Sequence, residues 1–294
     1  MAATSAPVRA PRRLNRSGGR GPRVGLFRGL SLVGMILLAA SALFPLYFML
    51  SNAFRTQADW ANSKLGLPTT FSLDAFRRAW VGAEIPTYFR NSVIVVSATV
   101  VLSVVLATTA GYSFSKLRWR GRRFGFLFTL SWMAIPPLLL MVPIYVEMVD
   151  LGIIDTYWSV ILLYTALNLP FNVYLMTTFF RQLPDELLEA ARIEGASVHQ
   201  IFLRVMVPMA RPALAMLCIF NFLWAWNEFV FALLLLQSDS SKTLTVGVLQ
   251  LQSRFNTDYP ALMAGLFLAS LPVIGVYLVF QRHLVRAVAA GALK

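Results

Sequence analysis

Polar and aromatic side chains recur at helical spacing inside two strongly apolar stretches of this sequence. In the first stretch, Tyr164, Asn168 and Asn172 follow one another at four-residue intervals, which places them on one face of a helix. Unpaired polar groups are costly at membrane depth. Hydroxyl, amide and aromatic groups could bind a neutral, hydroxyl-rich solute there, or they could hold neighbouring helices together.

The second stretch, residues 212–236, carries a matching set. Asn221, Trp224 and Glu228 stand at offsets of 0, 3 and 7 residues, again on one helical face. For Glu228 we favour a structural hydrogen bond near the outer end, because a single acid without a base gives little support to proton or ion transport. The candidate pathway residues are Tyr164, Asn168, Asn172, Asn221, Trp224, Asn227 and Glu228.

Catalytic chemistry is not indicated by the sequence. There is no G-x-x-x-x-G-K-[ST] motif to cradle a nucleotide phosphate. The two histidines, His199 and His283, lie outside the apolar runs, and the one cysteine, Cys218, has no partner for a disulfide. We therefore predict no catalytic, cofactor or metal site in this chain.

The elements that must position these residues are membrane-spanning helices. The sequence is 57% hydrophobic and 13% charged, with a mean hydropathy of +0.65, which indicates an all-α integral membrane protein. Six runs are long enough to cross a hydrocarbon core of about 30 Å: residues 30–50, 92–114, 124–145, 156–179, 212–236 and 260–280. We expect Asn91 and Ser92 to cap the second run. Pro136, Pro137 and Pro143 should kink or break the third, and Pro170 the fourth.

The basic residues indicate how these spans are oriented. With the N-terminus in the cytoplasm, 19 of the 26 Lys and Arg residues fall on the cytoplasmic side, as the positive-inside rule requires. The sequence therefore predicts cytoplasmic N- and C-termini in the cell membrane. The net charge of +13 then reflects topology and attraction to anionic lipid, and nucleic acid is not an expected partner.

The predicted chain organisation has four parts. Residues 1–28 form a disordered, Arg-rich tail, and residues 29–90 contain the first span with an external loop. Residues 91–283 hold the five-span core, which includes a polar loop at 184–208, and residues 284–294 form a second cytoplasmic tail. Aromatic residues in the loop 51–90 predict a small folded cap, which could cover the bundle or contact a partner.

The polar stretch from Pro184 to Pro208 predicts two short helices joined at an elbow. Pro184 suits a first helical position, and the acids after it suit the positive end of the helix dipole. Gly195 suits the left-handed position that ends a helix. Ser197 and Gln200 form a capping-box pattern that starts the next one. Such a hairpin could lie on the bilayer surface or present its small residues to another protein.

The spacing within this stretch resembles the EAA loop of permease subunits in ABC importers. Glu189, Ala190 and Ala191 are followed after three residues by Gly195 and, nine residues later, by a segment that ends at Pro208. Other short segments resemble the carbohydrate branch of that family, in particular its maltose-type permeases: residues 88–92, 111–112, 117–121, 226–229 and 291–294.

The resemblance implies a type I ABC importer permease fold with six transmembrane helices and a cytoplasmic helix-elbow-helix coupling loop. It implies docking of that loop on an ATPase through Glu186, Glu189, Ala190, Ala191, Glu194, Gly195, Ala196 and Pro208. The implied partners are a second related permease, two cytoplasmic ATPase subunits and an external binding protein that delivers a sugar. Another solute, such as a phosphate ester or polyamine, and a passive channel or scaffold are the alternatives.

Overall fold

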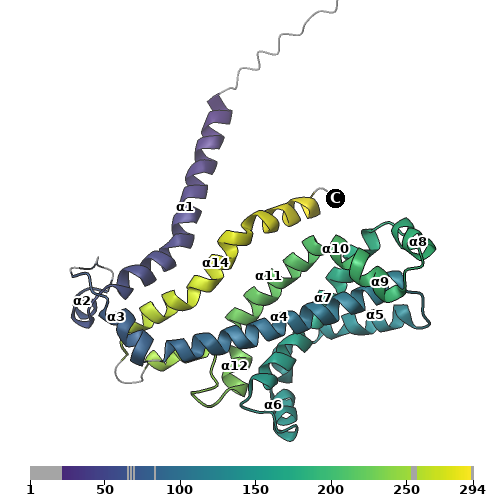
Figure 1. Cartoon of the computed structure of the whole chain (residues 1–294). Helices are drawn as coiled ribbons and strands as arrows, with labels where there is room; N and C mark the ends of the chain where they lie inside the picture. The colour runs from purple at the N-terminus through teal and green to yellow at the C-terminus, as the bar shows by residue number, and fades with distance from the viewer. Residues whose placement is uncertain are drawn as a thin grey trace, which may run out of the picture. The chain divides into compact units, whose positions relative to one another are not determined.

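A computed structural model of the chain describes residues 22–64, 66, 68, 70–82, 84–252 and 257–292, and within these residues all regular elements are helical. The chain divides into two units, Met1–Tyr47 and Phe48–Lys294. The longer α-helices are α1 (Pro22–Ala53), α4 (Ile85–Lys116), α5 (Arg122–Ser131), α6 (Met141–Asp150), α7 (Tyr157–Gln182), α8 (Glu186–Ile193), α11 (Arg211–Asn227) and α14 (Tyr259–Ala292) (Figure 1). The short ones are α2 (Gln57–Asn62), α3 (Asp74–Arg77), α9 (Val198–Ile201), α10 (Val207–Met209), α12 (Val230–Leu235) and α13 (Leu244–Gly247). The 3₁₀ segments are η2 (Trp132–Ala134), η3 (Pro137–Leu140) and η5 (Val248–Leu251), and the π-helical segments are η1 (Arg78–Gly82) and η4 (Phe202–Met206).

The first unit consists mainly of α1. Its backbone is already helical at Pro22, eight residues before the predicted start of the first span, and residues 1–21 of the predicted disordered tail lie outside the described part of the chain. None of the apolar window in Gly29–Ala53 is buried. Because this helix is long and apolar enough to cross a bilayer, its exposed surface suits lipid.

The predicted membrane spans coincide with helices or with broken helices. Four described helices are long and apolar enough to span a membrane: Gly29–Ala53, Ile85–Lys116, Tyr157–Gln182 and Tyr259–Gln281. The third predicted span is divided into Arg122–Ala134 and Pro137–Asp150, which meet at 89°. The fifth is divided into α11 and α12, so the prediction of one continuous run over 212–236 is wrong at Glu228 and Phe229.

The prolines act differently according to their position within a helix. Pro136 and Pro137 lie at the 89° break, as predicted. Pro143 lies in the first turn of α6, where its missing N–H costs nothing, so it breaks no helix. Pro170 lies inside α7, and that helix continues on both sides of it, so of the predicted kink or break the break does not occur.

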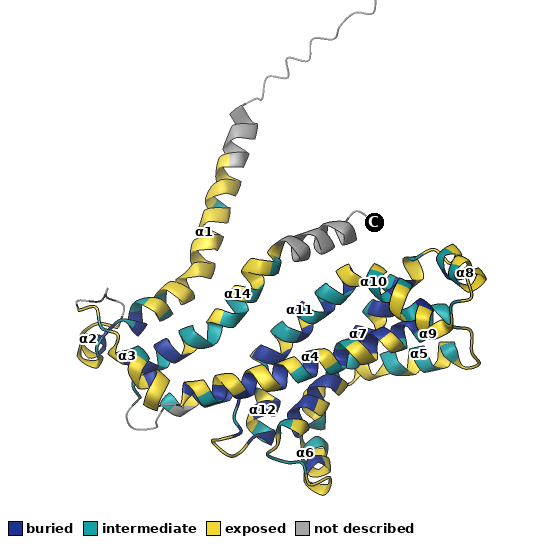
Figure 2. Ribbon diagram, in the orientation of Figure 1, coloured by how far each residue is buried: buried dark blue, intermediate teal, exposed yellow. Residues whose placement is uncertain are grey.

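The core of the second unit forms where α4, α7 and α11 pack together. Buried positions follow the inner sides of these helices (Figure 2). A Cβ atom on Gly111 of α4 would lie 2.6 Å from Cβ of Met176 in α7, so glycine permits this close approach. One buried cluster, which includes Tyr88 and Tyr164, lies toward the α6–α7 turn, and a second, which includes Phe180 and Ile201, lies beside α8 and α9.

The loop after α1 forms a folded cap, as predicted. Trp60 of α2 is buried and stacks on Tyr259 of α14, with 5.0 Å between ring centroids. Phe54 stacks on Phe71 at 4.3 Å. Arg78 forms an ion pair with Asp258, with 2.6 Å between Nε and Oδ2. These contacts fasten the cap to the start of α14.

Candidate coupling loop and polar pathway

The elbow of the polar loop has the geometry predicted for it. The first helix, α8, begins at Glu186 with Asp185 as its N-cap, so Pro184 lies just before the helix rather than in its first position. At the other end, the N–H of Ala196 donates to the carbonyl of Ala191, and the N–H of Gly195 donates to that of Arg192. Gly195 has a φ of +80°. These features define a Schellman motif, which ends α8 and turns the chain.

The second arm of the loop begins with the predicted capping box. Ser197 Oγ accepts from the N–H of Gln200, and Gln200 Oε1 accepts from the N–H of Ser197. The arm continues through α9, η4 and α10 as far as Met209, and then bends by 75° into α11. The membrane helix α11 is therefore the direct continuation of the loop.

The loop has a buried side and an exposed side. Leu188, Ile201 and Met206 are buried in the cluster that also contains residues of α4, α7 and α11. The exposed side carries most of the predicted docking residues: Glu186, Glu189, Ala190, Glu194 and Gly195 are exposed, while Ala191, Ala196 and Pro208 are half-buried. Ile193 is 88% exposed beside them, and sequence analysis did not single it out. An isoleucine presented in this way, next to acids and small residues, suits contact with another protein.

A lysine fastens the loop to the membrane helices. Lys116, the last residue of α4, donates from Nζ to the carbonyl of Leu183 at 2.6 Å and to Oδ1 of Asp185 at 2.5 Å. The hydrogen bond from Lys116, assisted by its charge, lowers the pKa of Asp185 below the ordinary value. The ends of α4 and α7 and the start of α8 therefore meet at one ammonium group, which sequence spacing gave no means of locating.

Two asparagines from the predicted pathway bind each other. Asn172 of α7 and Asn221 of α11 exchange hydrogen bonds of 2.9 and 3.2 Å, and both side chains are buried. Asn221 Nδ2 also donates to the carbonyl of Leu217. Each amide is thus satisfied within the protein, which is the arrangement expected of residues that join helices.

Tyr164 and Glu228 form a second link between the same two spans. Tyr164 Oη donates to Glu228 Oε2 at 2.5 Å, and the two carboxylate oxygens accept from the N–H groups of Phe231 and Ala232. Glu228 therefore satisfies the free N–H groups at the start of α12. This is a structural hydrogen bond of the kind favoured from the sequence, although Glu228 follows the end of α11 rather than lying on its face.

The remaining pathway candidates keep some exposed surface. Trp224 is 36% exposed and contacts Tyr164 edge to face, with centroids 5.2 Å apart. Asn227 is exposed, and Asn168 is half-buried. Both amides donate within their own helices, to the carbonyls of Leu223 and Tyr164 respectively. Of the seven candidates, Trp224, Asn227 and the half-buried Asn168 and Glu228 thus retain surface that a solute could contact.

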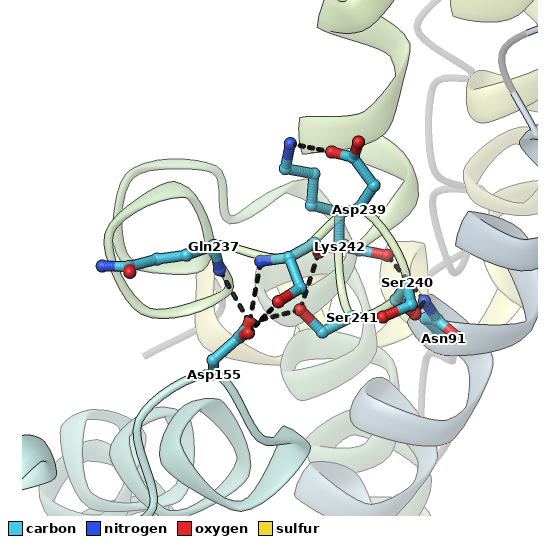
Figure 3. A network of polar contacts seen from close by, with 8 residues as sticks. Asn91, Asp155, Gln237, Asp239, Ser240, Ser241 and Lys242 are labelled. Atoms are coloured by element: carbon cyan, nitrogen blue, oxygen red, sulfur yellow. Dashed lines mark hydrogen bonds and ion pairs between the residues drawn. The ribbon is translucent and has the colours of Figure 1, made fainter.

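On the far side from the coupling loop, Asp155 holds the segment that follows α12. Its Oδ1 accepts from the N–H groups of Gln237 and Ser238 and from the hydroxyl of Ser241, and its Oδ2 accepts from the hydroxyl of Ser238 (Figure 3). Burial raises the pKa of Asp155, but these hydrogen bonds outweigh it and bring the pKa to about 2.

The residues expected to cap the second span instead bind the segment that Asp155 holds. Since α4 begins at Ile85, Asn91 and Ser92 lie inside it, and the prediction that they cap the span is wrong. Asn91 Nδ2 donates to the carbonyls of Ser240 and Lys242 (Figure 3), and Ser92 Oγ accepts from the N–H of Leu244. A capping pattern seen in sequence can equally mark a buried side chain that binds a distant loop.

The described residues offer little that could support catalysis. Among them, no group of three or more His, Cys, Asp or Glu side chains is placed to hold a metal ion. His199 is exposed at the start of α9, and the side chain of His283 lies outside the described part.

A family model and individual relatives both match this chain. Residues 87–290 match the family described as "Binding-protein-dependent transport system inner membrane component". The diacetylchitobiose uptake system permease protein NgcG of Streptomyces coelicolor is 33% identical, over 91% of this chain and 89% of its own. The arabinooligosaccharides transport system permease protein AraQ of Halalkalibacterium halodurans is 32% identical, over 90% of this chain and 96% of its own.

The fold also matches a solved structure. One chain of a bacterial ABC transporter involved in the import of the acidic polysaccharide alginate superimposes with a TM-score of 0.80 and 25% sequence identity. The match covers 90% of this chain and 98% of that one.

Proposed function

We propose that this chain, which belongs to the family of binding-protein-dependent transport system inner membrane components, forms half of the pathway through which an ATP-driven importer carries a carbohydrate across the cell membrane. The chain is a multi-pass membrane protein of the ABC importer permease type. The observation that carries the proposal is the elbow at Gly195, which presents an exposed acidic and apolar surface while its other side is packed into the bundle.

In this proposal, the coupling loop docks on a cytoplasmic ATPase. Ile193, Glu189 and Glu194 supply the exposed contact, and Lys116 with Leu188 transmits displacement of the loop to α4 and α7. Two such ATPases would use Mg²⁺ and ATP, and a second related permease would complete the pathway. Cytoplasmic termini follow from the placement of the basic residues.

A sugar is the proposed cargo because the relatives named above are permeases for oligosaccharides, and because the accessible candidates other than the half-buried Glu228 are neutral. Trp224 offers an aromatic face, and Asn168 and Asn227 offer amides. Such groups suit a hydroxyl-rich solute better than a phosphate ester or a polyamine, which would need opposing charge. An external binding protein would deliver the cargo near the segment held by Asp155.

A pull-down from native membranes in mild detergent tests this assignment. We compare the wild type with Gly195→Asp and with a matched control, Gly152→Asp, since both glycines have positive φ and a Cβ atom added at either would have nothing within 4 Å. An ATPase subunit should copurify with the wild type and the control, but be reduced with Gly195→Asp. Uptake of labelled oligosaccharides should fall in parallel. Absence of any ATPase from the wild-type complex would refute the proposal and favour a passive channel or scaffold.

A further inference from the structure

Three arginine side chains converge on a hollow where α5 begins and α7 ends. It has a volume of about 300 Å³ and is lined by Phe114, Arg122, Arg123, Phe126, Leu127 and Arg181. Arg122 and Arg123 are the first two residues of α5, and Arg181 lies in the last turn of α7. Among the described residues, no acid lines this hollow. The hollow is thus a concentration of positive charge with an apolar floor.

The arginines are held in place by contacts that leave their charge unneutralised. Arg122 Nη1 donates to the carbonyl of Leu117 at 3.0 Å, and the guanidinium of Arg181 lies 5.0 Å from the centroid of the Phe126 ring. None of the three forms an ion pair within the described part of the chain. Cations in the first turn of a helix are also disfavoured by the helix dipole. A bound anion would relieve this electrostatic cost.

Apolar surface continues directly from the hollow along α5. Phe124, Leu127 and Phe128 share one face of that helix and are 75%, 54% and 56% exposed. Because α5 is the beginning of the third predicted span, this face lies where hydrocarbon starts. A guanidinium cluster beside an exposed apolar helix face matches an amphiphile with an anionic head.

We propose that this hollow binds the phosphate of an anionic phospholipid, with an acyl chain lying along Phe124, Leu127 and Phe128. A free phosphate or an acidic protein segment would use the charge but leave the apolar face uncovered. The site is distinct from the Arg-rich N-terminal segment, and the proposal goes beyond the importer role because it requires neither ATP nor cargo.

Native mass spectrometry of the full-length chain, purified in a neutral detergent, provides the test. Phosphatidylglycerol and phosphatidylcholine with identical acyl chains are titrated in turn. We expect phosphatidylglycerol to be retained at a concentration about tenfold lower, as expected for several basic residues at one anionic head. The double variant Arg123→Gln/Arg181→Gln should lose most of this preference. The matched control Arg204→Gln/Arg211→Gln, which removes two exposed cations elsewhere on the coupling-loop side, should keep it.

Two further experiments separate loss of charge from loss of fold, and a lipid site from a free-phosphate site. Arg123→Lys/Arg181→Lys preserves the charge and should retain part of the preference, which separates loss of charge from loss of fold. Millimolar inorganic phosphate or glycerol 3-phosphate should fail to displace the lipid. Displacement by either would identify a free-phosphate site and overturn the lipid assignment, and so would an undiminished preference in the Arg123→Gln/Arg181→Gln variant.

Discussion

Lys116 Nζ lies 2.5 Å from Asp185 Oδ1, and the two side chains are unequally exposed, at 5% and 76% respectively. The lysine is therefore part of the helix bundle, while the aspartate belongs to the surface of the loop. Because the same ammonium also binds the carbonyl of Leu183, the loop is joined to α4 by both a side chain and the backbone.

Replacing Lys116 should affect the protein more than replacing its acidic partner. Lys116→Met removes both hydrogen bonds and leaves the carbonyl of Leu183 unpaired, which costs about 1–3 kcal/mol. Asp185→Asn should cost less, because an exposed ion pair contributes little and the bond to Leu183 remains. Thermal unfolding of the purified chain and the ATPase activity of the complex measure the two effects. Equal losses of stability and of ATPase activity in the two variants would contradict the larger role assigned to Lys116.

The cost of replacing Gly195 should depend on how readily the new residue adopts a positive φ. Its φ of +80° and the open space around it predict that Gly195→Asn is mild, while Gly195→Ala costs about 1 kcal/mol and Gly195→Val costs more. Gly152→Ala, with a φ of +68°, is the matched control for strain alone. We expect similar unfolding temperatures for the two alanine variants but reduced ATPase copurification only for Gly195→Ala. Equal copurification would leave the elbow without a docking role.

Close packing of α4 on α7 predicts that Gly111→Ala is destabilising. The added Cβ would meet Met176 Cβ at 2.6 Å and backbone atoms at 3.0 Å. Since these backbones must separate to admit it, we expect a loss of about 1–3 kcal/mol. Gly275→Ala, which has nothing within 4 Å of the added atom, should be neutral or slightly stabilising. Thermal unfolding in detergent compares the stability of the two variants. A lower unfolding temperature for Gly275→Ala than for Gly111→Ala would contradict the close packing of α4 on α7.

Some variants of the polar pathway residues should change the stability of the protein, and others should change sugar uptake. Asn221→Leu leaves buried Asn172 unpaired and should cost about 1–3 kcal/mol, whereas Asn172→Leu/Asn221→Leu should recover part of that loss. Trp224→Ala and Asn227→Ala remove partly exposed groups. They should change the KM for sugar uptake with little change in unfolding temperature. Unchanged uptake kinetics in both would assign all these residues to packing.

Low pH should release the segment held by Asp155. Its pKa is depressed from 3.8 to about 2, so its contribution to stability is complete above pH 4 and is lost as the pH falls toward 2. Asp155→Asn should loosen the segment at neutral pH and remove this dependence. Hydrogen exchange at Gln237, Ser238 and Ser241 measures the change. The same pH profile in wild type and variant would exclude Asp155 as its source.

Much of the architecture could be predicted because it depends on local signals. Long apolar runs located four helices that are long enough to span a membrane and the helices of the two broken runs. Gly195 with Ser197 and Gln200 located the elbow and its second arm. Helical spacing drew attention to Asn172 and Asn221, and both side chains are buried in the bundle. These features follow from interactions within a few residues of sequence, which a single chain displays directly.

Contacts between residues that are far apart in the sequence could not be predicted in the same way. Nothing local distinguishes Lys116, whose acceptor Asp185 is 69 residues away, from other basic residues near a membrane surface. Glu228 lies in an apolar run, yet the run breaks there because the carboxylate binds N–H groups of the next helix. Pro143 and Pro170 interrupt no helix although both are helix-breaking residues. The effect of a proline depends on its position relative to the helix boundary and on the surrounding packing.

The shared core of Leu188, Ile201 and Met206 with the membrane helices has a thermodynamic consequence. A helix as short as α8 is not stable alone in water, so its shape depends on the bundle beneath it. If the loop docks on an ATPase as proposed, a partner that favours a bundle arrangement with a different loop shape changes the affinity of that docking. Linkage requires the reverse effect to have the same magnitude. The coupling free energy can therefore be measured by varying either partner.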